Sequence, residues 1–150
     1  MDPRCLRRET KVMGIKSIVV GIDGSETSYR AFAMAVGVAV RENGCVHACF
    51  VAHLPGAAAI GGFFAPVPLL ADSASDERLA RYVTEELFVA SIGGDFTYRT
   101  GEIAAEIEIL AETCRADLIV VGRSEHPHLH LGGVPRQLLG RGRFPILVVP

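Results

Sequence analysis

The segment VVGRSEHPHLHLGGVP, residues 120–135, contains side chains that could bind a metal ion. His126, His128 and His130 alternate along it, and Glu125 precedes them. On an extended backbone alternate residues point to one side, so these imidazoles could hold Zn²⁺ together with a fourth ligand. No cysteine or further acid stands at a spacing typical of metal sites. We therefore expect no metal, and the histidines have no assigned role.

Glycines in the same segment offer a second kind of chemistry, the binding of phosphate. Gly122 ends an apolar strand, and Gly132 and Gly133 precede a short helix. Bare backbone N–H groups at such turns can approach phosphate oxygens closely, and a helix N-terminus adds a favourable dipole. The tetrapeptide IVVG occurs at 18–21 as well as at 119–122. Ligands of open α/β sheets bind at the carboxyl ends of strands, so the two turns are predicted to frame one crevice.

Nucleophilic or acid–base catalysis has little support in the sequence. Ser25 lies in GIDGS, which lacks the G-x-S-x-G turn of hydrolases, and it is better explained as the N-cap of a helix. A Walker-type phosphate loop, G-x-x-x-x-G-K-[ST], does not occur. His47 and His53 fall in the second predicted strand, and neither has an identifiable catalytic partner. We expect a protein that is not an enzyme.

The 150 residues are enough for one domain with a substantial core. Hydrophobic residues make up 49% and charged residues 21%, which is typical of a globular protein. The formal net charge of -2 gives no bulk attraction to nucleic acid or to an anionic membrane, so neither is expected as a partner. No stretch is apolar enough for a membrane span or a signal peptide. Residues 1–15 are predicted to be a flexible tail before a domain over residues 16–150.

The cysteines are predicted to be free thiols. Cys5, Cys45, Cys49 and Cys114 include no C-x-x-C pair. On a strand, Cys45 and Cys49 would lie about 13 Å apart at ~3.3 Å per residue, which is too far for a disulfide. The three cysteines of the domain are most simply buried small hydrophobes. Reduced thiols fit a cytoplasmic protein.

Hydrophobic periodicity alternates between strands and helices along the chain. The contiguous β-branched residues at 18–20 indicate a strand buried on both faces, and the spacing of Leu79 and Val83 is helical. The predicted strands cover residues 16–21, 45–54, 95–100, 116–122 and 144–149, and the predicted helices cover 26–43, 75–92, 101–114 and 135–140. Asn43 with Gly44 is predicted to end the first helix, and Gly93 with Gly94 the second. Ile103 and Ile107 are predicted to face inward from the third helix. Residues 54–72, rich in Gly, Ala and Pro, are predicted to form a surface loop. This order predicts an open parallel sheet with helices on both faces.

Four segments together resemble the universal stress protein family. They are IVVGIDGSETSYRAF, GEIAAEIEILAETCRADLIVVG, LGGV and FPILVV, in that order. The resemblance covers residues 16–150 and implies the α/β fold of that family, the adenine nucleotide alpha-hydrolase-like fold, with five parallel strands in the order 3-2-1-4-5. It also implies a homodimer paired through the last strand, Ile146 to Val149, and stress-related regulation in place of a defined catalytic reaction.

Some members of this family bind ATP, and the resemblance carries the residues of their site onto this chain. Asp23 corresponds to the acid that faces adenine, Gly21 to backbone that lines the ribose, and Val51 to backbone that meets the base. Gly122 and Gly132 correspond to the first and third glycines of the phosphate-binding motif. From the residues alone, Asp23 could also be a turn residue that caps the following helix. The candidate nucleotide site consists of Gly21, Asp23, Val51, Gly122, Arg123, Gly132, Gly133 and Val134.

Three departures from the family motif weaken the phosphate end of this site. Glu125 stands at the second glycine, Gly133 replaces a Ser or Thr, and only nine residues separate Gly122 from Gly132, three fewer than in the motif. Loss of the hydroxyl removes a charge-assisted hydrogen bond of about 1.5–3 kcal/mol. A carboxylate ~4 Å from a phosphate oxygen repels it by about 4 kcal/mol at an effective dielectric near 20. The sequence therefore predicts a degenerate site for ATP or AMP between the first and fourth strands.

Other functions stay open on this sequence. Arginines near the loop could replace the lost phosphate contacts, namely Arg123, Arg136, Arg141 and Arg143. The chain could instead be a dimeric scaffold or interaction module that binds no nucleotide. A weak ATP hydrolase is a third possibility, but position 133 lacks the Ser or Thr that would hold Mg²⁺.

Overall fold

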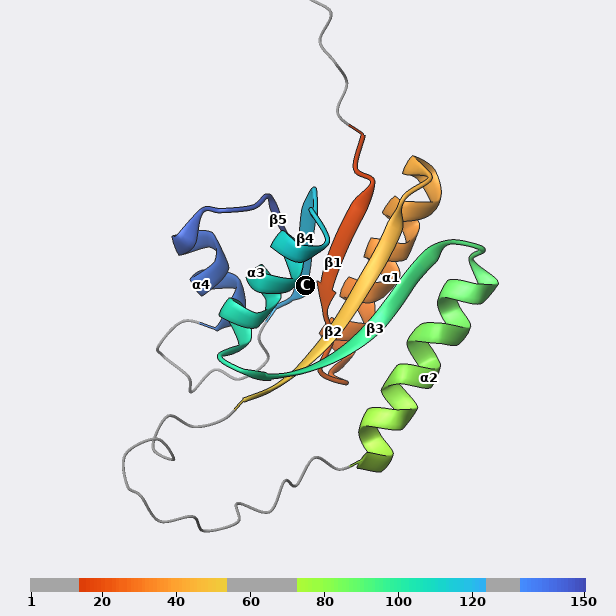
Figure 1. The fold of residues 1–150 in the computed structure, drawn as a ribbon, viewed down its shortest axis with the longest axis horizontal. Coiled ribbons are helices and arrows are strands. Elements are labelled where there is room, and N and C mark those ends of the chain that lie inside the picture. The colour runs from red at the N-terminus through yellow and green to blue at the C-terminus, as the bar shows by residue number, and fades with distance from the viewer. Residues whose placement is uncertain (1–13, 54–72, 124–132) are drawn as a thin grey trace, which may run out of the picture.

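The computed structural model describes residues 14–53, 73–123 and 133–150, in which strands and helices alternate along the chain (Figure 1). The strands are β1 (Ser17–Gly21), β2 (Cys45–His53), β3 (Gly93–Gly101), β4 (Leu118–Gly122) and β5 (Ile146–Val149). The helices are α1 (Glu26–Glu42), α2 (Ser73–Val89), α3 (Ile103–Thr113) and α4 (Val134–Arg141). The predicted alternation of strand and helix is confirmed.

The described strands form one parallel sheet in the order β3-β2-β1-β4-β5, which confirms the predicted order 3-2-1-4-5. Helices α1 and α2 cover one face of the sheet, and α3 and α4 cover the other (Figure 1). The central strands β1 and β4 are the most deeply buried, and Val19, Val20, Ile119 and Val120 are 0% exposed. Contiguous apolar residues are expected in strands that helices cover on both faces.

The boundary between α2 and β3 differs from the prediction. Gly93 and Gly94, predicted to end a helix, are the first residues of β3, and α2 ends at Val89. The intervening turn uses Ser91, whose φ of 55° lies in the left-handed region. Gly94 is required inside the strand because a Cβ atom there would lie 2.1 Å from the carbonyl oxygen of Val46 on β2. This glycine pair therefore marks a close approach of two strands.

Both ends of α1 are capped as the sequence predicts. Ser25 is the N-cap, and its hydroxyl accepts a hydrogen bond from the N–H of Ser28 at 3.2 Å. Asn43 ends the helix with a left-handed φ of 51°, and its N–H donates to the Ala39 carbonyl oxygen. Because α1 follows β1 after a short turn, the N-cap fixes the path of the chain at the end of the first strand.

Helix α3 begins with an acidic cap. The Glu102 carboxylate accepts hydrogen bonds from the N–H of Ala104 at 3.1 Å, from the N–H of Ala105 at 2.8 Å and from Arg141 Nη2 at 2.8 Å. Desolvation by itself raises the pKa of Glu102, but the hydrogen bonds from Arg141 and the two N–H groups lower it below its ordinary value. The ionised carboxylate thus stabilises both the start of α3 and its contact with α4.

We expect Glu102→Gln to lower the free energy of unfolding at pH 7 by about 1 kcal/mol, the usual contribution of an N-cap. The contribution of the charge is complete above the ordinary pKa of 4.5 and is lost as the pH falls through the lowered pKa of the folded state. Urea unfolding of both proteins should therefore give a difference at pH 7 that narrows at pH 3. The exposed Glu85→Gln serves as a control and should change little at either pH. A difference that is equally wide at pH 3 would contradict this account.

Candidate functional site

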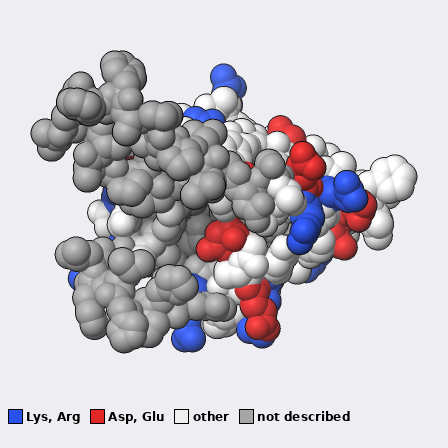
Figure 2. Space-filling view, turned by 90° about the horizontal axis from the view of Figure 1, so that it is seen from below, with Lys and Arg blue, Asp and Glu red and all other residues white. Residues whose placement is uncertain are grey.

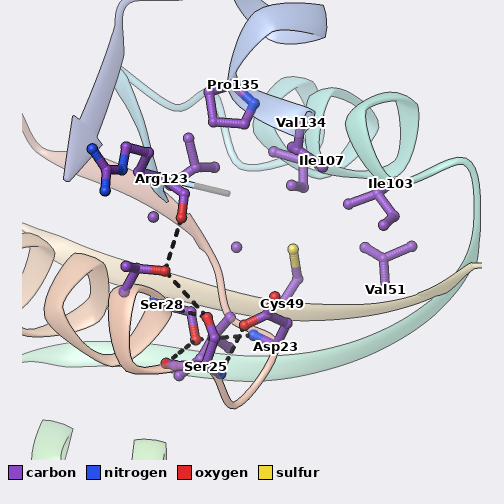
Figure 3. Close-up of a pocket in the computed structure, with 15 residues that line it drawn as sticks. Asp23, Ser25, Ser28, Cys49, Val51, Ile103, Ile107, Arg123, Val134 and Pro135 are labelled. Carbon is purple, nitrogen blue, oxygen red and sulfur yellow. Dashed lines mark hydrogen bonds between the residues drawn. The ribbon is translucent and has the colours of Figure 1, made fainter. Parts of the chain in front are cut away.

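A pocket opens at the carboxyl ends of β1, β2 and β4 (Figure 3). Its volume is about 170 Å³, and Gly21 and Gly122 both line it. Since β1 and β4 are neighbours in the sheet, the strand ends at Gly21 and Gly122 lie side by side at one rim. Figure 2 looks at this end of the molecule, where acidic and basic side chains of the described residues are interspersed. The crevice predicted from the two strand ends is therefore present.

Gly21 and Gly122 end the two IVVG segments but face opposite sides of the sheet. The pairing of β1 with β4 shifts one segment by one residue relative to the other. A Cβ atom on Gly21 would lie 3.0 Å from Ile107 Cδ1 of α3, whereas a Cβ atom on Gly122 would lie 2.7 Å from the carbonyl group of Thr27 in α1. Gly21 thus leaves space on the α3 side of the pocket, and Gly122 allows the first turn of α1 to approach β4.

The turn between β1 and α1 supplies the polar wall of the pocket. Asp23 Oδ1 accepts a hydrogen bond from the Ser25 N–H at 2.9 Å, and the Asp23 N–H donates to the Ser28 hydroxyl at 3.2 Å (Figure 3). The Thr27 hydroxyl donates to the Arg123 carbonyl oxygen at 3.0 Å and joins this turn to the end of β4. Asp23 therefore has the turn role that its residue type allows, and it also lines the pocket.

Asp23 is ionised at neutral pH. Desolvation raises its pKa, but hydrogen bonds with Ser25 and Ser28 outweigh this effect and lower the pKa below its usual value. An ionised carboxylate accepts hydrogen bonds and donates none. The polar wall can therefore receive an N–H or O–H group of a ligand.

The opposite wall is apolar. It is formed by Val51 of β2, Ile103 and Ile107 of α3, and Val134 of α4 (Figure 3). Cys49 also lines the pocket, and burial raises the pKa of its thiol to about 12, so that it is protonated at neutral pH and packs as a small apolar side chain. Pockets that combine apolar walls with a few polar groups are typical of small-molecule sites.

The first turn of α4 borders the pocket but offers few hydrogen-bond donors. Its N-cap is Gly133, which has no side chain that could accept a hydrogen bond from the first N–H groups of the helix. Pro135 has no N–H, and the N–H groups of Arg136 and Gln137 donate to the Gly133 carbonyl oxygen at 2.9 Å and 3.3 Å. The N–H groups of Gly133 and Val134 are the ones in this turn for which the helix itself provides no acceptor. An anion here would find the N–H groups of Gly133 and Val134, where a helix start usually presents up to four.

Of the four arginines predicted as possible phosphate partners, Arg123 lines the pocket. Its N–H donates to the Val149 carbonyl oxygen at 2.7 Å, and its side chain extends away from the apolar wall (Figure 3). Arg141 and Arg143 instead form ion pairs with acids of α3 and its cap. Arg136 is exposed on α4 and does not line the pocket.

Several residues named in the sequence analysis lie outside the described residues. They are Gly132, Glu125, His126, His128, His130, the side chain of His53, most of the predicted tail and the 54–72 loop. In the part of the chain that the structure describes, no three His, Cys, Asp or Glu side chains are grouped so that they could hold a metal ion. No helix in the same part is long and apolar enough to cross a membrane.

Nine of the residues that line the pocket were not predicted as site residues, and Thr27, Ser28, Ile103 and Ile107 are among them. Thr27 and Ser28 follow the N-cap of α1, and their place directly after the β1 turn was an available signal. The sequence predicts Ile103 and Ile107 to face inward from α3, which they do. Helical spacing shows that a residue faces inward, but the position of α3 across the sheet decides whether it meets the core or a pocket.

Comparison with protein-family models matches residues 14–150 to the universal stress protein family. A solved structure of a family member from Burkholderia pseudomallei is 20% identical, with 91% of this chain and 96% of that chain covered and a TM-score of 0.71. A universal stress protein in complex with cAMP is 22% identical, covering 92% and 98% of the two chains with a TM-score of 0.70. The universal stress protein from Archaeoglobus fulgidus in complex with dAMP is 19% identical, covering 92% and 100% with a TM-score of 0.63. A comparison with curated proteins gives no match.

These solved structures share the fold, which confirms the adenine nucleotide alpha-hydrolase-like architecture expected from the resemblance. The family match spans the described residues from 14 to 150, including both walls of the pocket. The chain belongs to the universal stress protein family.

Proposed function

We propose that this chain is a non-enzymatic regulatory protein of the stress response that binds an adenine nucleotide and prefers AMP to ATP. The observation that carries the proposal is the pocket that Gly21 and Gly122 line at the strand ends, with one polar and one apolar wall. Two structures of family members contain cAMP or dAMP, which are adenine nucleotides with a single phosphate. Together these observations favour an adenine nucleotide in the pocket of this protein.

The walls of the pocket suit the adenosine part of the ligand. The side chains of Val51 and Ile107 can pack against the faces of adenine, and the Asp23 carboxylate can accept from its exocyclic amine. Gly21 lines the pocket without a side chain, which lets a ribose approach the backbone. In this proposal the base and the sugar supply most of the binding energy.

The phosphate end suits a ligand of low charge. Gly133 has no hydroxyl and Pro135 no N–H, so the donors at the start of α4 and the end of β4 are the N–H groups of Gly133 and Val134 and the side chain of Arg123. Each missing charge-assisted hydrogen bond costs about 1.5–3 kcal/mol. Glu125, which occupies the second-glycine position of the family motif, adds repulsion toward distal phosphates. The missing donors and the repulsion weaken the binding of ATP more than that of AMP, because ATP carries two further phosphates.

Thermal unfolding with AMP, ADP, ATP and GMP, each with and without Mg²⁺, tests the proposal. A ligand at 100 times its Kd stabilises the folded state by about 2.7 kcal/mol. For a domain of this size that corresponds to a rise in Tm of roughly 5–10 °C. We expect AMP to give the largest shift, ATP a smaller one and GMP little. No shift with any nucleotide at millimolar concentration would favour the alternative, a dimeric scaffold that binds no nucleotide.

We expect Asp23→Ala to weaken AMP binding at least tenfold, because it removes a charge-assisted hydrogen bond of about 1.5–3 kcal/mol. Asp23→Asn keeps an acceptor oxygen for the turn and should lose less affinity. Glu26→Ala removes an exposed acid of the same turn, paired with Arg30, and controls for net charge. Calorimetric titration measures all three variants. Unchanged affinity in Asp23→Ala would remove Asp23 from the binding site.

The proposal also includes a cytoplasmic homodimer. Strand β5 lies at one edge of the described sheet, and Ile146, Leu147 and Val148 on it are half-buried apolar residues. An apolar edge strand requires cover, and a twofold partner would supply it through the same strand. A bound nucleotide would then stabilise the folded dimer, which other proteins would recognise. Light scattering after gel filtration should give the mass of two chains, and the mass of one chain would contradict the dimer.

A further inference from the structure

A second polar cluster lies at the opposite rim of the sheet from the pocket. Cys45 is the first residue of β2, whereas the pocket lies at the carboxyl ends of the strands. His47 is two residues further along β2, so its side chain points to the same face of the sheet as that of Cys45. Asp95 on β3 stands directly opposite His47. Two adjacent strands thus bring a thiol, an imidazole and a carboxylate together.

Hydrogen-bond contacts link these three side chains, with the His47 imidazole between the thiol and the carboxylate. His47 Nδ1 lies 2.9 Å from Asp95 Oδ1, and His47 Nε2 lies 3.4 Å from Cys45 Sγ. When Nδ1–H donates to the carboxylate, Nε2 presents its lone pair to the thiol. An activated cysteine requires a base in contact with the thiol and a third group that orients the base. His47 and Asp95 are placed for these two roles.

Small molecules can reach this cluster. Cys45 is half-buried, the side chain of His47 is 19% exposed, and that of Asp95 is 60% exposed. The Lys16 carbonyl oxygen lies 3.4 Å from Cys45 Sγ and is a second acceptor for the thiol hydrogen. The sulfur is therefore held in place on two sides and is not sealed in the core.

Of the other described cysteines, Cys49 is buried and Cys114 is half-buried like Cys45. Burial raises the pKa of Cys49 to about 12. Burial also raises the pKa of Cys114, and the nearby Asp95 and Cys45 raise it further. Both thiols are protonated at neutral pH, whereas the thiolate is the nucleophilic form of cysteine. Among the described cysteines, Cys45 is the one whose sulfur contacts the His47 imidazole.

We propose that Cys45 is a site of oxidation by hydroperoxides, with His47 as its base and Asp95 as the residue that positions the imidazole. His47 Nε2 takes the thiol proton, and the sulfur attacks the terminal peroxide oxygen. The S–O bond forms as the O–O bond breaks, and the leaving oxygen takes the proton from His47. The cysteine is oxidised by two electrons to a sulfenic acid, and the peroxide is reduced to an alcohol, or to water in the case of hydrogen peroxide.

Hydroperoxides make use of both protonation states of His47. Their leaving oxygen is basic and requires a proton, which the newly formed imidazolium holds next to the sulfur. Iodoacetamide also reacts with thiolates, but the iodide that leaves requires no proton. The ratio of the two rates at Cys45 therefore reports proton donation by His47 separately from access to the sulfur.

The test uses the full chain with Cys5→Ser, treated with hydrogen peroxide and dimedone at pH 7. Mass spectrometry of peptides measures the rate of sulfenic acid trapping at each cysteine, and iodoacetamide is used in parallel. We expect Cys45 to be trapped at least about tenfold faster than Cys49 and Cys114. We expect His47→Gln to lower the peroxide rate at Cys45 by about tenfold or more, and Asp95→Asn to lower it severalfold.

In both variants the ratio of the peroxide rate to the iodoacetamide rate should fall. A substitution that only disturbed the rim of the sheet would change both rates together and leave their ratio unaltered. Asp76→Asn on α2 is a charge-matched control and should change neither rate. Equal trapping at Cys45, Cys49 and Cys114 in the parent protein, or an unchanged rate ratio in His47→Gln, would overturn the proposal.

Discussion

Gly122→Ala is expected to lower the free energy of unfolding by about 2–3 kcal/mol, the upper part of the usual range for an overpacked site. The added Cβ atom would lie 2.7 Å from the Thr27 carbonyl carbon and oxygen and 2.9 Å from the Ser28 nitrogen. These are backbone atoms in the first turn of α1, so they cannot move without displacing the helix from β4. Urea unfolding followed by circular dichroism measures the change.

Two other glycines provide matched controls for this substitution. On Gly21 the added Cβ atom would meet the end of the Ile107 side chain at 3.0 Å, which can shift, so Gly21→Ala should cost less than Gly122→Ala. On Gly140 in α4 no atom lies within 4 Å of the added Cβ. Gly140→Ala should therefore be neutral or stabilising by up to about 1 kcal/mol, as expected for a helical glycine. Equal free energies of unfolding for Gly122→Ala, Gly21→Ala and Gly140→Ala would contradict a close contact between α1 and β4 at Gly122.

Arg141→Met is expected to destabilise the fold by about 3 kcal/mol, because it leaves a buried carboxylate without its main partner. The Glu108 side chain is 5% exposed, and Arg141 Nη1 lies 2.9 Å from its Oε2. Arg143 Nη1 is 3.9 Å from the same oxygen and can replace only part of this interaction. Arg141 also reaches the Glu102 cap, so the substitution loosens the contact between α3 and α4.

The double variant Glu108→Leu with Arg141→Met distinguishes a buried unpaired charge from a general loss of packing. Replacing both partners of a buried ion pair by apolar residues is often neutral or stabilising, so the double variant should be more stable than Arg141→Met alone. Arg30→Met removes an exposed ion pair of α1 and should cost at most about 0.5 kcal/mol. A double variant less stable than Arg141→Met would contradict the charge argument.

Gly122 and the ion pair between Arg141 and Glu108 position the helices on opposite sides of the candidate nucleotide pocket. Gly122 sets the distance between β4 and the polar wall at Thr27, and Arg141 ties α4, which carries Val134, to α3, which carries Ile107. The pocket depends on the positions of both helices relative to the sheet. Variants that loosen either contact are therefore expected to weaken nucleotide binding as well as stability.

The sequence predicted the fold because the relevant signals are local. Runs of β-branched residues, the Ser25 cap and the Asn43 stop depend on near neighbours in the chain, and the structure confirms them. The strand order came from the family resemblance, which the structure and the family match also confirm. A pair of glycines can end a helix or allow two strands to approach closely. At Gly93 and Gly94 the prediction chose the helix end and was wrong, because both residues belong to β3.

Within the site, the sequence by itself determined that Gly21 and Gly122 would meet at strand ends, since parallel strands direct their carboxyl ends to one rim. Asp23 and Val51 came from the family resemblance, and both line the pocket. The tertiary structure alone decided that the two glycines face opposite helices, because a one-residue shift between neighbouring strands reverses the side that a residue faces. It also paired Arg141 with Glu108, and His47 with Asp95, which is 48 residues away in the chain. Such contacts depend on strand register and helix packing, and no periodic pattern along the chain encodes them.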